Sequence, residues 1–485
     1  MKRMTFPFSR LAPLAAALAL AGCASTGGIA PQAQLRSPES LGLAAPVAAS
    51  AQPAAPLHAD WWREFGDAQL DALMDKALQG NPNLRAAQAR VERAQAMTGA
   101  AQAALLPKLG GELDAQRQKL SANSLYPPPY GGAVFNTGTL QLAGNWEIDF
   151  FGKNRAALDA TLNAAQAARA DADAARVLLS TNVARAWFQL ARIDDQLEVA
   201  RRTLAQREES LKLVQDRVHA GLDTTLELRQ SEGSLPEARQ QIEALSEQAE
   251  IARHALAALA GLGNQPLQAS PSLATARRLG LPAALPADLL GQRADIAAAR
   301  WRVEAAGAEI RNARAQFYPN VNLVAFAGLS SFGLDRLLHS GSEQWGVGPA
   351  IRLPIFEGGQ LRANLRGKSA DYDAAVESYN AALLDAIRDT ADQVSSSRSI
   401  ERQQAEQQQA AKAAEDAYQI AVQRYKAGLG TYLNVLSAET AVLAQRRLAV
   451  DLAGRALDTQ VSLVRALGGG WQPAAPAAGT DLAAR

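Results

Sequence analysis

Residues 140–150 read LQLAGNWEIDF, and apolar and polar side chains alternate along this stretch. One set of positions is apolar: Leu140, Leu142, Trp146, Ile148 and Phe150. The intervening set contains Gln141, Asn145, Glu147 and Asp149. A period of two is typical of a β-strand with one face toward lipid and the other toward water. We therefore predict a membrane-facing strand here.

The same alternation recurs about 200 residues later in the chain. Its apolar positions are Trp345, Val347, Ile351, Leu353 and Ile355, opposite Gln344 and Arg352. Segments starting at Leu109 and Val321 supply the second strand of each hairpin, so four spanning strands are expected. Because about eight strands are the fewest that close a barrel, several copies must assemble if these strands span. On pattern alone, a soluble sheet of two hairpins packed on helices stays open.

The chain also repeats itself. A set of residues recurs 207 positions later: Arg217, Ala220, Gly221, Leu222, Thr224, Leu226, Glu232 and Arg239 match Arg424, Ala427, Gly428, Leu429, Thr431, Leu433, Glu439 and Arg446. A helical segment ending at Pro107 similarly matches one ending at Pro319. This self-similarity indicates a duplication. We expect a first repeat over residues 61–270 and a second over residues 271–471.

Long helices follow each pair of strands. Apolar residues recur every seven positions at Leu190, Leu197, Leu204, Leu211 and Val218, and again at Leu228, Leu235, Ile242, Ala249 and Leu256, a coiled-coil pattern that predicts an antiparallel pair. The first helix, over residues 154–219, would be roughly 100 Å long. Two shorter helices, over 224–260 and 293–318, would together have nearly the same length if they were stacked end to end. The link between them, with Pro266, Pro271, Pro282 and Pro286, would form an equatorial collar.

The N-terminus has the features of an export signal. Lys2, Arg3 and Arg10 precede an apolar run over residues 11–21, which is too short to span a bilayer comfortably. The next residues, Leu20-Ala21-Gly22-Cys23, resemble a lipobox, in which the thiol of Cys23 is acylated, with palmitate among the expected lipids. We expect a lipoprotein signal peptide over 1–22, a lipidated flexible tether over 23–60 and a disordered tail over 472–485.

Composition and charge exclude several functions. The net charge of +1 offers no general attraction for nucleic acid. The four histidines, His58, His219, His254 and His339, lack metal-ligand spacing, and no nucleophile and base can be nominated. The glycine run at 468–470 is more typical of a helix end than of a nucleotide site. We expect no catalytic residue, metal or cofactor, and hence no enzyme.

Four segments resemble the outer-membrane efflux protein family, the TolC-like and OprM-like channels, and specifically its lipoprotein branch. They are Trp61-Trp62-Arg63-Glu64-Phe65 with Leu84-Arg85-Ala86-Ala87, then Trp146-Glu147-Ile148-Asp149-Phe150-Phe151-Gly152, then Arg424-Tyr425-Lys426-Ala427-Gly428, and Ala466-Leu467-Gly468-Gly469-Gly470-Trp471. The resemblance implies a mainly α protein with a transmembrane β part. It would be a homotrimer with a twelve-stranded β-barrel continued by a twelve-helix α-barrel, located in the outer membrane and extending into the periplasm.

The resemblance also implies a function, partners and sites. The trimer would be a passive conduit for drugs or other small molecules, working with a periplasmic adaptor and an inner-membrane pump of the RND type. The adaptor would contact two tips: Ala220, Gly221, Leu222 and Thr224, and Ala427, Gly428, Leu429 and Thr431. The periplasmic constriction would lie at Leu433, Asn434 and Ser437, and related channels often have aspartates at the last two of these positions. The ring would then be neutral here, unless Glu227 or Glu439 supplies an acidic one.

Three alternatives remain open at this point. The same trimer could be the exit duct of a type I protein secretion system. A lipid-anchored periplasmic coiled-coil scaffold would have one helical hairpin and no lipid-facing alternation. A lipoprotein hydrolase would need a catalytic constellation, which the sequence does not offer.

Overall fold

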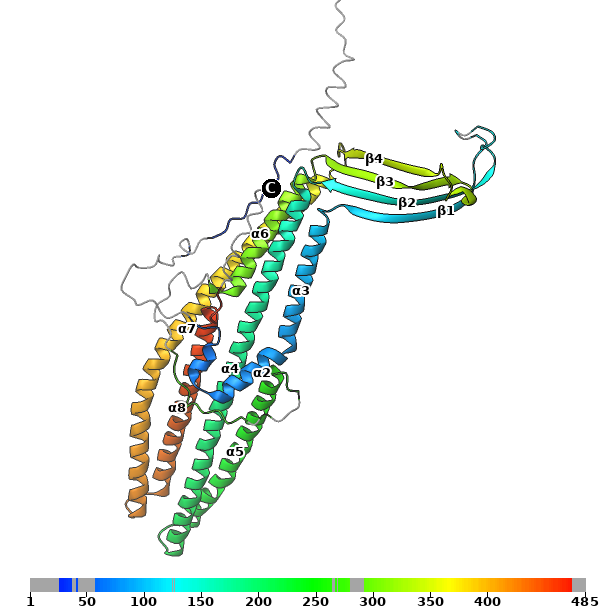
Figure 1. Ribbon diagram of the computed structural model, residues 1–485. Helices are drawn as coiled ribbons and strands as arrows, with labels where there is room; N and C mark the ends of the chain where they lie inside the picture. The colour runs from blue at the N-terminus through cyan, green and yellow to red at the C-terminus, as the bar shows by residue number, and fades with distance from the viewer. Residues whose placement is uncertain are drawn as a thin grey trace, which may run out of the picture. The chain divides into compact units, whose positions relative to one another are not determined.

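The computed structural model describes residues 26–36, 41, 57–123, 125, 127–263, 267, 269–279 and 292–472 (Figure 1). The expected signal peptide, Cys23, about half of the proline-containing link and nearly all of the expected tail lie outside these residues. The chain divides into two compact units: unit 1 comprises residues 1–35, 90–168 and 299–379, and unit 2 comprises the remainder. In the part of the chain that the structure describes, no helix combines the length and the apolar character needed to cross a membrane.

The main elements follow the same order in both halves: a helix, two strands, a long helix and a shorter helix. They are η3 (Trp61–Phe65), α2 (Ala68–Gly80), α3 (Pro82–Ala103), β1 (Lys108–Lys119), β2 (Val134–Ile148), α4 (Lys153–His219), α5 (Thr225–Leu259), α6 (Ala294–Ala315), β3 (Asn320–Phe332), η5 (Leu334–Arg336), β4 (Glu343–Arg352), α7 (Gln360–Lys426) and α8 (Tyr432–Ala466). Helices α4 and α7 each have 67 residues, α5 and α8 each have 35, and α3 and α6 each have 22. Helices α5 and α6 are therefore somewhat shorter than the predicted segments over 224–260 and 293–318.

Unit 1 contains one antiparallel sheet with the strand order β1-β2-β3-β4 (Figure 1). Both predicted hairpins are present, and β2 also pairs with β3, which joins them. Two strands end earlier than predicted. β2 stops at Ile148 because the Phe150 N–H turns back to the Ile148 carbonyl (2.9 Å), and β4 stops at Arg352, two residues before Pro354, which has no N–H to donate. Phe150, Leu353 and Ile355 therefore lie beyond the strands.

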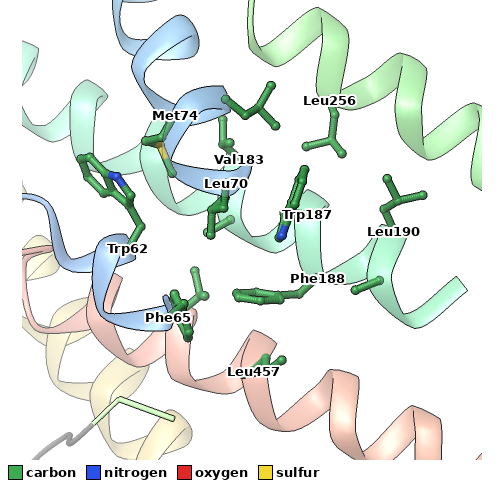
Figure 2. Close-up of a cluster of buried hydrophobic side chains, with 14 of the residues drawn as sticks. Trp62, Phe65, Leu70, Met74, Val183, Trp187, Phe188, Leu190, Leu256 and Leu457 are labelled. Atoms are coloured by element: carbon green, nitrogen blue, oxygen red, sulfur yellow. The ribbon is translucent and has the colours of Figure 1, made fainter. Parts of the chain in front are cut away.

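Most of the large aromatic side chains of unit 2 lie in one core (Figure 2). Phe65 of η3 faces Phe188 of α4 edge to face, with ring centroids 4.8 Å apart. Trp187 is 1% exposed, and its Nε1–H donates to Asp67 Oδ2 (2.8 Å). The other oxygen of Asp67 accepts from the first backbone amides of α2, so one carboxylate both caps that helix and fixes the indole.

The long helices of unit 2 pack as the heptads predict. Leu197 and Ala200 of α4 contact Leu245 of α5, and Arg253 pairs with Asp194 (3.2 Å) across the same two helices. A second set of contacts was not predicted. Helix α4 is joined to α8 by three ion pairs: Arg185 with Asp458 (2.7 Å), Arg192 with Asp451 (2.9 Å) and Arg207 with Glu439 (3.2 Å). The two helical hairpins of unit 2 are therefore held side by side through α4 and α8.

Residues 26–36 differ from the expected flexible tether. Ile29 is buried against Ile310, Phe317 and Leu365 in unit 1. The backbone amides of Gln32 and Ala33 both donate to Asp373 of α7 (2.8 and 2.9 Å). This segment lies against α6 and α7 because one apolar side chain and two backbone donors find partners there.

Candidate functional sites on the sheet and at the helical tips

The register of the sheet places apolar side chains from all four strands on one side, here called the apolar face. It comprises Leu109, Leu113, Leu140, Leu142, Trp146, Ile148, Val321, Leu323, Leu329, Trp345, Val347 and Ile351. Many of these side chains are exposed, with Trp345 at 78%, Leu109 at 75% and Leu142 at 57%. The alternative of a soluble sheet packed on helices is therefore wrong, because the described helices do not cover this face. A patch of this size needs an apolar environment.

The opposite side of the sheet, here called the polar face, carries hydrogen-bonded side chains. Gln141 Nε2 donates to Glu112 Oε2 (2.8 Å), and Gln344 Nε2 donates to Gln141 Oε1 (3.2 Å). In the register, Gly328 lies between Gln141 and Gln344, and the absence of a side chain there lets the two amides meet. This row suits contact with water.

The two tips have the same backbone geometry. After α4, the amide of Gly221 donates to Val218 O (3.0 Å) and that of Leu222 to Arg217 O (2.9 Å); after α7, Gly428 and Leu429 repeat these bonds. Gly221 and Gly428 have φ values of +71° and +73°, the left-handed conformation that ends many helices. Leu222 is 65% exposed and Leu429 is 69% exposed, although such leucines often pack on their own helix. Both leucines are therefore open to solvent in the single chain.

A polar cluster ties the first tip to the second hairpin. Asp223 pairs with Arg217 (2.9 Å) and accepts a hydrogen bond from the hydroxyl of Tyr425, which is 2% exposed. The Arg217 guanidinium also lies 4.6 Å from the centre of the Tyr425 ring, a cation–π contact. In the second half, Gly430 stands at the position that corresponds to Asp223. The cluster is therefore built from the first tip, and the second tip has no equivalent carboxylate.

The electrostatics of this cluster favour a charged Asp223. Burial raises the pKa of this carboxyl, but hydrogen bonds from Arg217 and Tyr425 outweigh burial and hold its pKa below the usual range. Burial, together with the hydrogen bond to Asp223, raises the pKa of the Tyr425 phenol. At neutral pH the phenol is therefore a donor and the carboxylate an acceptor.

The predicted constriction residues lie on one exposed side of α8. Leu433 is 64% exposed, and Asn434 and Ser437 are also exposed, whereas Tyr432 and Val435 are buried against the other helices of unit 2. The two glutamates that could have supplied an acidic ring, Glu439 and Glu227, make other contacts. Glu439 is 6% exposed and pairs with Arg207, and Glu227 closes a capping box with Thr224 at the start of α5.

The glycine run ends α8, as expected. Gly469 N–H bonds Val464 O (2.8 Å), and Gly468, Gly469 and Gly470 all have positive φ. A Cβ at Gly470 would lie 2.1 Å from the carbonyl oxygen of His58, so only glycine fits. The following Trp471 donates to Asp173 (2.9 Å), which fixes the end of the helix.

Sequence reasoning missed the residues that join the hairpins. Arg185 and Arg192 are seven residues apart, as are their partners Asp451 and Asp458, and this matched spacing was the available signal. Arg217 was noted only as part of the repeat. Among the described residues, no three or more His, Cys, Asp or Glu side chains come together to hold a metal ion.

An exposed apolar sheet face combined with two long helical hairpins is typical of membrane-associated proteins. The scaffold alternative is wrong, because it allowed one hairpin and no such face.

Comparison with known proteins identifies the family within this class. The profile described as outer membrane efflux protein matches residues 73–262 and 285–469, and the chain belongs to this family. It is 40% identical to the fusaric acid resistance protein FusA of Burkholderia cepacia, over 74% of this chain and 69% of FusA. It is 34% identical to the pyoverdine export outer membrane protein OpmQ of Pseudomonas aeruginosa, over 95% and 97% of the two chains.

Solved structures agree with this assignment. The outer membrane protein VceC of Vibrio cholerae is 38% identical and superposes with a TM-score of 0.79, over 86% of this chain and 100% of that one. The outer membrane channel MtrE of Neisseria gonorrhoeae is 28% identical with a TM-score of 0.78, over 91% and 98%. The protein is thus an outer-membrane efflux protein whose structural relatives are channels.

The tip cluster gives a first prediction. Asp223→Asn leaves the Arg217 charge in a largely buried site without a carboxylate, so hydrogen exchange in the last turn of α7 should accelerate roughly 10- to 100-fold, or about 1.5–3 kcal/mol. Because the pKa of Asp223 is lowered, its contribution is present above the unfolded pKa of about 3.9 and is lost as pH falls through the folded value. The difference between wild type and variant should therefore persist at neutral pH and vanish in strong acid.

The matched control is Asp216→Asn, an exposed carboxylate on α4, which should leave exchange in α7 unchanged. Equal protection of α7 in wild type and Asp223→Asn at neutral pH would show that the cluster does not hold the tip.

Proposed function

We propose that the protein is a passive trimeric conduit that carries drugs or other small molecules across the periplasm and the outer membrane. The observation that carries this proposal is the division of one sheet into an exposed apolar face and a polar face. Such a sheet suits a wall between lipid and a water-filled passage. The substrate needs no covalent change, because an inner-membrane pump would supply the energy for transport.

Hydrogen bonding at the sheet edges supports the trimer. In the described chain, β1 pairs only with β2 and β4 only with β3, so each edge has unpaired backbone groups. Three copies would bring twelve strands into one closed barrel, with β4 of one copy beside β1 of the next. Closure would satisfy every backbone group in the hydrocarbon region, as a spanning structure requires.

Two adjacent residues of β2 test the assignment of the faces. Leu142→Arg places a charge on the apolar face and should reduce insertion into the outer membrane, at a cost of about 2–4 kcal/mol if the residue lies near the bilayer midplane. Gln141→Arg places the same charge on the polar face and should insert normally. The measurement is the fraction of protein in the outer membrane that resists extraction, and equal insertion of the two variants contradicts the proposal.

We propose that a periplasmic adaptor binds the two tips and that an inner-membrane pump of the RND type drives transport. Exposed Leu222 and Leu429, each held at a rigid helix end, support this assignment because a partner could bury them without unfolding the turn. The names of FusA and OpmQ refer to fusaric acid resistance and pyoverdine export, so small molecules are favoured over the protein substrates of a type I system.

The tips give a second functional prediction. Leu429→Asp should abolish efflux and adaptor cross-linking while leaving the trimer intact, because an aspartate cannot enter an apolar pocket on the adaptor without a desolvation cost. Leu448→Asp changes a 43%-exposed leucine elsewhere on the second hairpin and is the control. Normal efflux by Leu429→Asp at normal protein level would rule out this contact.

We propose that Leu433, Asn434 and Ser437 line the narrowest part of the passage as a neutral ring. Their shared exposure on α8 supports this, since threefold symmetry would repeat each side chain around the axis. Glu227 and Glu439 are unsuited to an acidic ring because one caps a helix and the other forms an ion pair.

Single-channel recordings in planar bilayers test this ring. Ser437→Asp should raise cation selectivity and introduce block by divalent cations, because three carboxylates would then face one another in a narrow pore. Thr440→Asp provides a control at an exposed site further along α8. Unchanged selectivity in Ser437→Asp, with normal conductance, would remove these residues from the constriction.

The lipid anchor is a separate proposal, because Cys23 lies outside the described residues. Acylation of Cys23 should make the protein incorporate labelled fatty acid, and Cys23→Ser should lose that label. Equal labelling of both forms would exclude a lipid at this position.

A further inference from the structure

The side of the sheet that carries the apolar face changes character toward the hairpin end, away from the helices. On β1, the residues on this side of the sheet include Leu109, Leu113, Arg117 and Lys119, in order from the helix end to the hairpin end. Arg117 and Lys119 are exposed, and the register places them beside Asn136 and Val134 of β2. The last two positions of this side of β1 are therefore cationic.

A third cation comes from η5, which follows β3. If Gly138 of β2 had a Cβ, that atom would lie 2.9 Å from Leu334 and 3.2 Å from Leu337. Gly138 belongs to the same side of the sheet as Leu140 and Leu142, so η5 packs on that side, and η5 carries Arg336. In the structure as described, the side chains of Arg117, Lys119 and Arg336 form no ion pair.

Two carboxylates lie near these cations: Asp335 of η5, and Glu343, which the register places on the same side of the sheet as Leu329. Glu343, at the start of β4, accepts a hydrogen bond from the backbone amide of Gly341 (2.7 Å). Asp335 lies against the backbone of Gly333, where an added Cβ would come 2.6 Å from its oxygen. At the helix end of the sheet, Lys153 pairs with Glu147 (2.6 Å), whose side chain is on the polar face. This ion pair is therefore separate from the apolar face.

The distance along the strand places these cations beyond the apolar band. From Ile148 to Asn136, the partner of Arg117, β2 advances by twelve residues, roughly 40 Å along the strand. At a strand tilt of about 40°, this is roughly 30 Å across a membrane, slightly more than the apolar band of about 25 Å seen on such sheets. The three cations therefore fall at headgroup level on the side away from the helices.

We infer that Arg117, Lys119 and Arg336 bind the phosphate groups of an anionic glycolipid in the outer leaflet of the outer membrane. This inference rests on the proposed function, because the apolar face must meet lipid. The partner follows from charge complementarity and from continuity with the apolar face: acyl chains would lie on Leu113 and Leu140 while the phosphates meet the cations. Arginine suits this role because its guanidinium can bind two phosphate oxygens at once.

The test uses the full-length trimer in nanodiscs and a purified, phosphorylated, acylated glucosamine disaccharide as the probe. The triple variant Arg117→Gln, Lys119→Gln, Arg336→Gln should bind the probe roughly tenfold more weakly or worse, since each surface cation contributes to attraction for anionic lipid. The charge-keeping variant Arg117→Lys, Arg336→Lys should retain most of the affinity. Lys108→Gln, at the helix end of β1 and on the polar face, should bind as the wild type does.

Two further arms separate the sources of phosphate. The dephosphorylated disaccharide should bind weakly to the wild type, and millimolar inorganic phosphate should displace little of the phosphorylated probe. Equal binding by the triple variant, equal binding of the dephosphorylated probe, or full displacement by inorganic phosphate would each overturn the inference. These outcomes concern protein that has already inserted as a trimer, whereas failure of the wild type to insert would contradict the proposed function instead.

Discussion

Backbone hydrogen bonding at the edges of the four-stranded sheet constrains the rest of the protein. β1 and β4 are the edge strands of the described sheet, and the side chains between them form an exposed apolar face. In water such a face is unfavourable, and in lipid the unpaired edge groups cost several kcal/mol each. Neither environment suits one copy alone. Pairing the edges of several copies satisfies the edge groups, and the apolar face can then meet lipid without that cost.

The connection from sheet to helices follows from the same arrangement. Each strand is linked to one helix by a short segment: α3 leads into β1, β2 into α4, α6 into β3, and β4 into α7. Every strand added to a closed wall therefore brings a helix with it. In unit 2 the two hairpins are joined by ion pairs between α4 and α8 and by an apolar cluster that includes Val214, Tyr418 and Val435.

Local periodicity was enough to predict the strands, the long helices and the tips, because each depends on residues close in sequence. The pairing of β2 with β3 brings together segments such as Trp146 and Leu323, which no local pattern relates. The contact of Tyr425 with Asp223 has the same origin. The low-complexity composition of residues 26–36 suggested a tether, but one isoleucine and two backbone amides were enough to hold that segment on its helices.

The two halves share the lengths of their main helices but differ at their tips, and this difference bears on which partner the tips can bind. Thr224 closes a capping box with Glu227, whereas Thr431 makes no side-chain cap at the corresponding place. Asp223 engages Arg217, whereas in the second half Gly430 leaves Arg424 exposed and bonded only to the Leu429 carbonyl (3.2 Å). The first tip is therefore internally satisfied, and the second has a cation with unused donors. A partner that contacts both tips would meet two chemically different surfaces, so a duplicated chain can orient a partner that a repeat of identical tips could not.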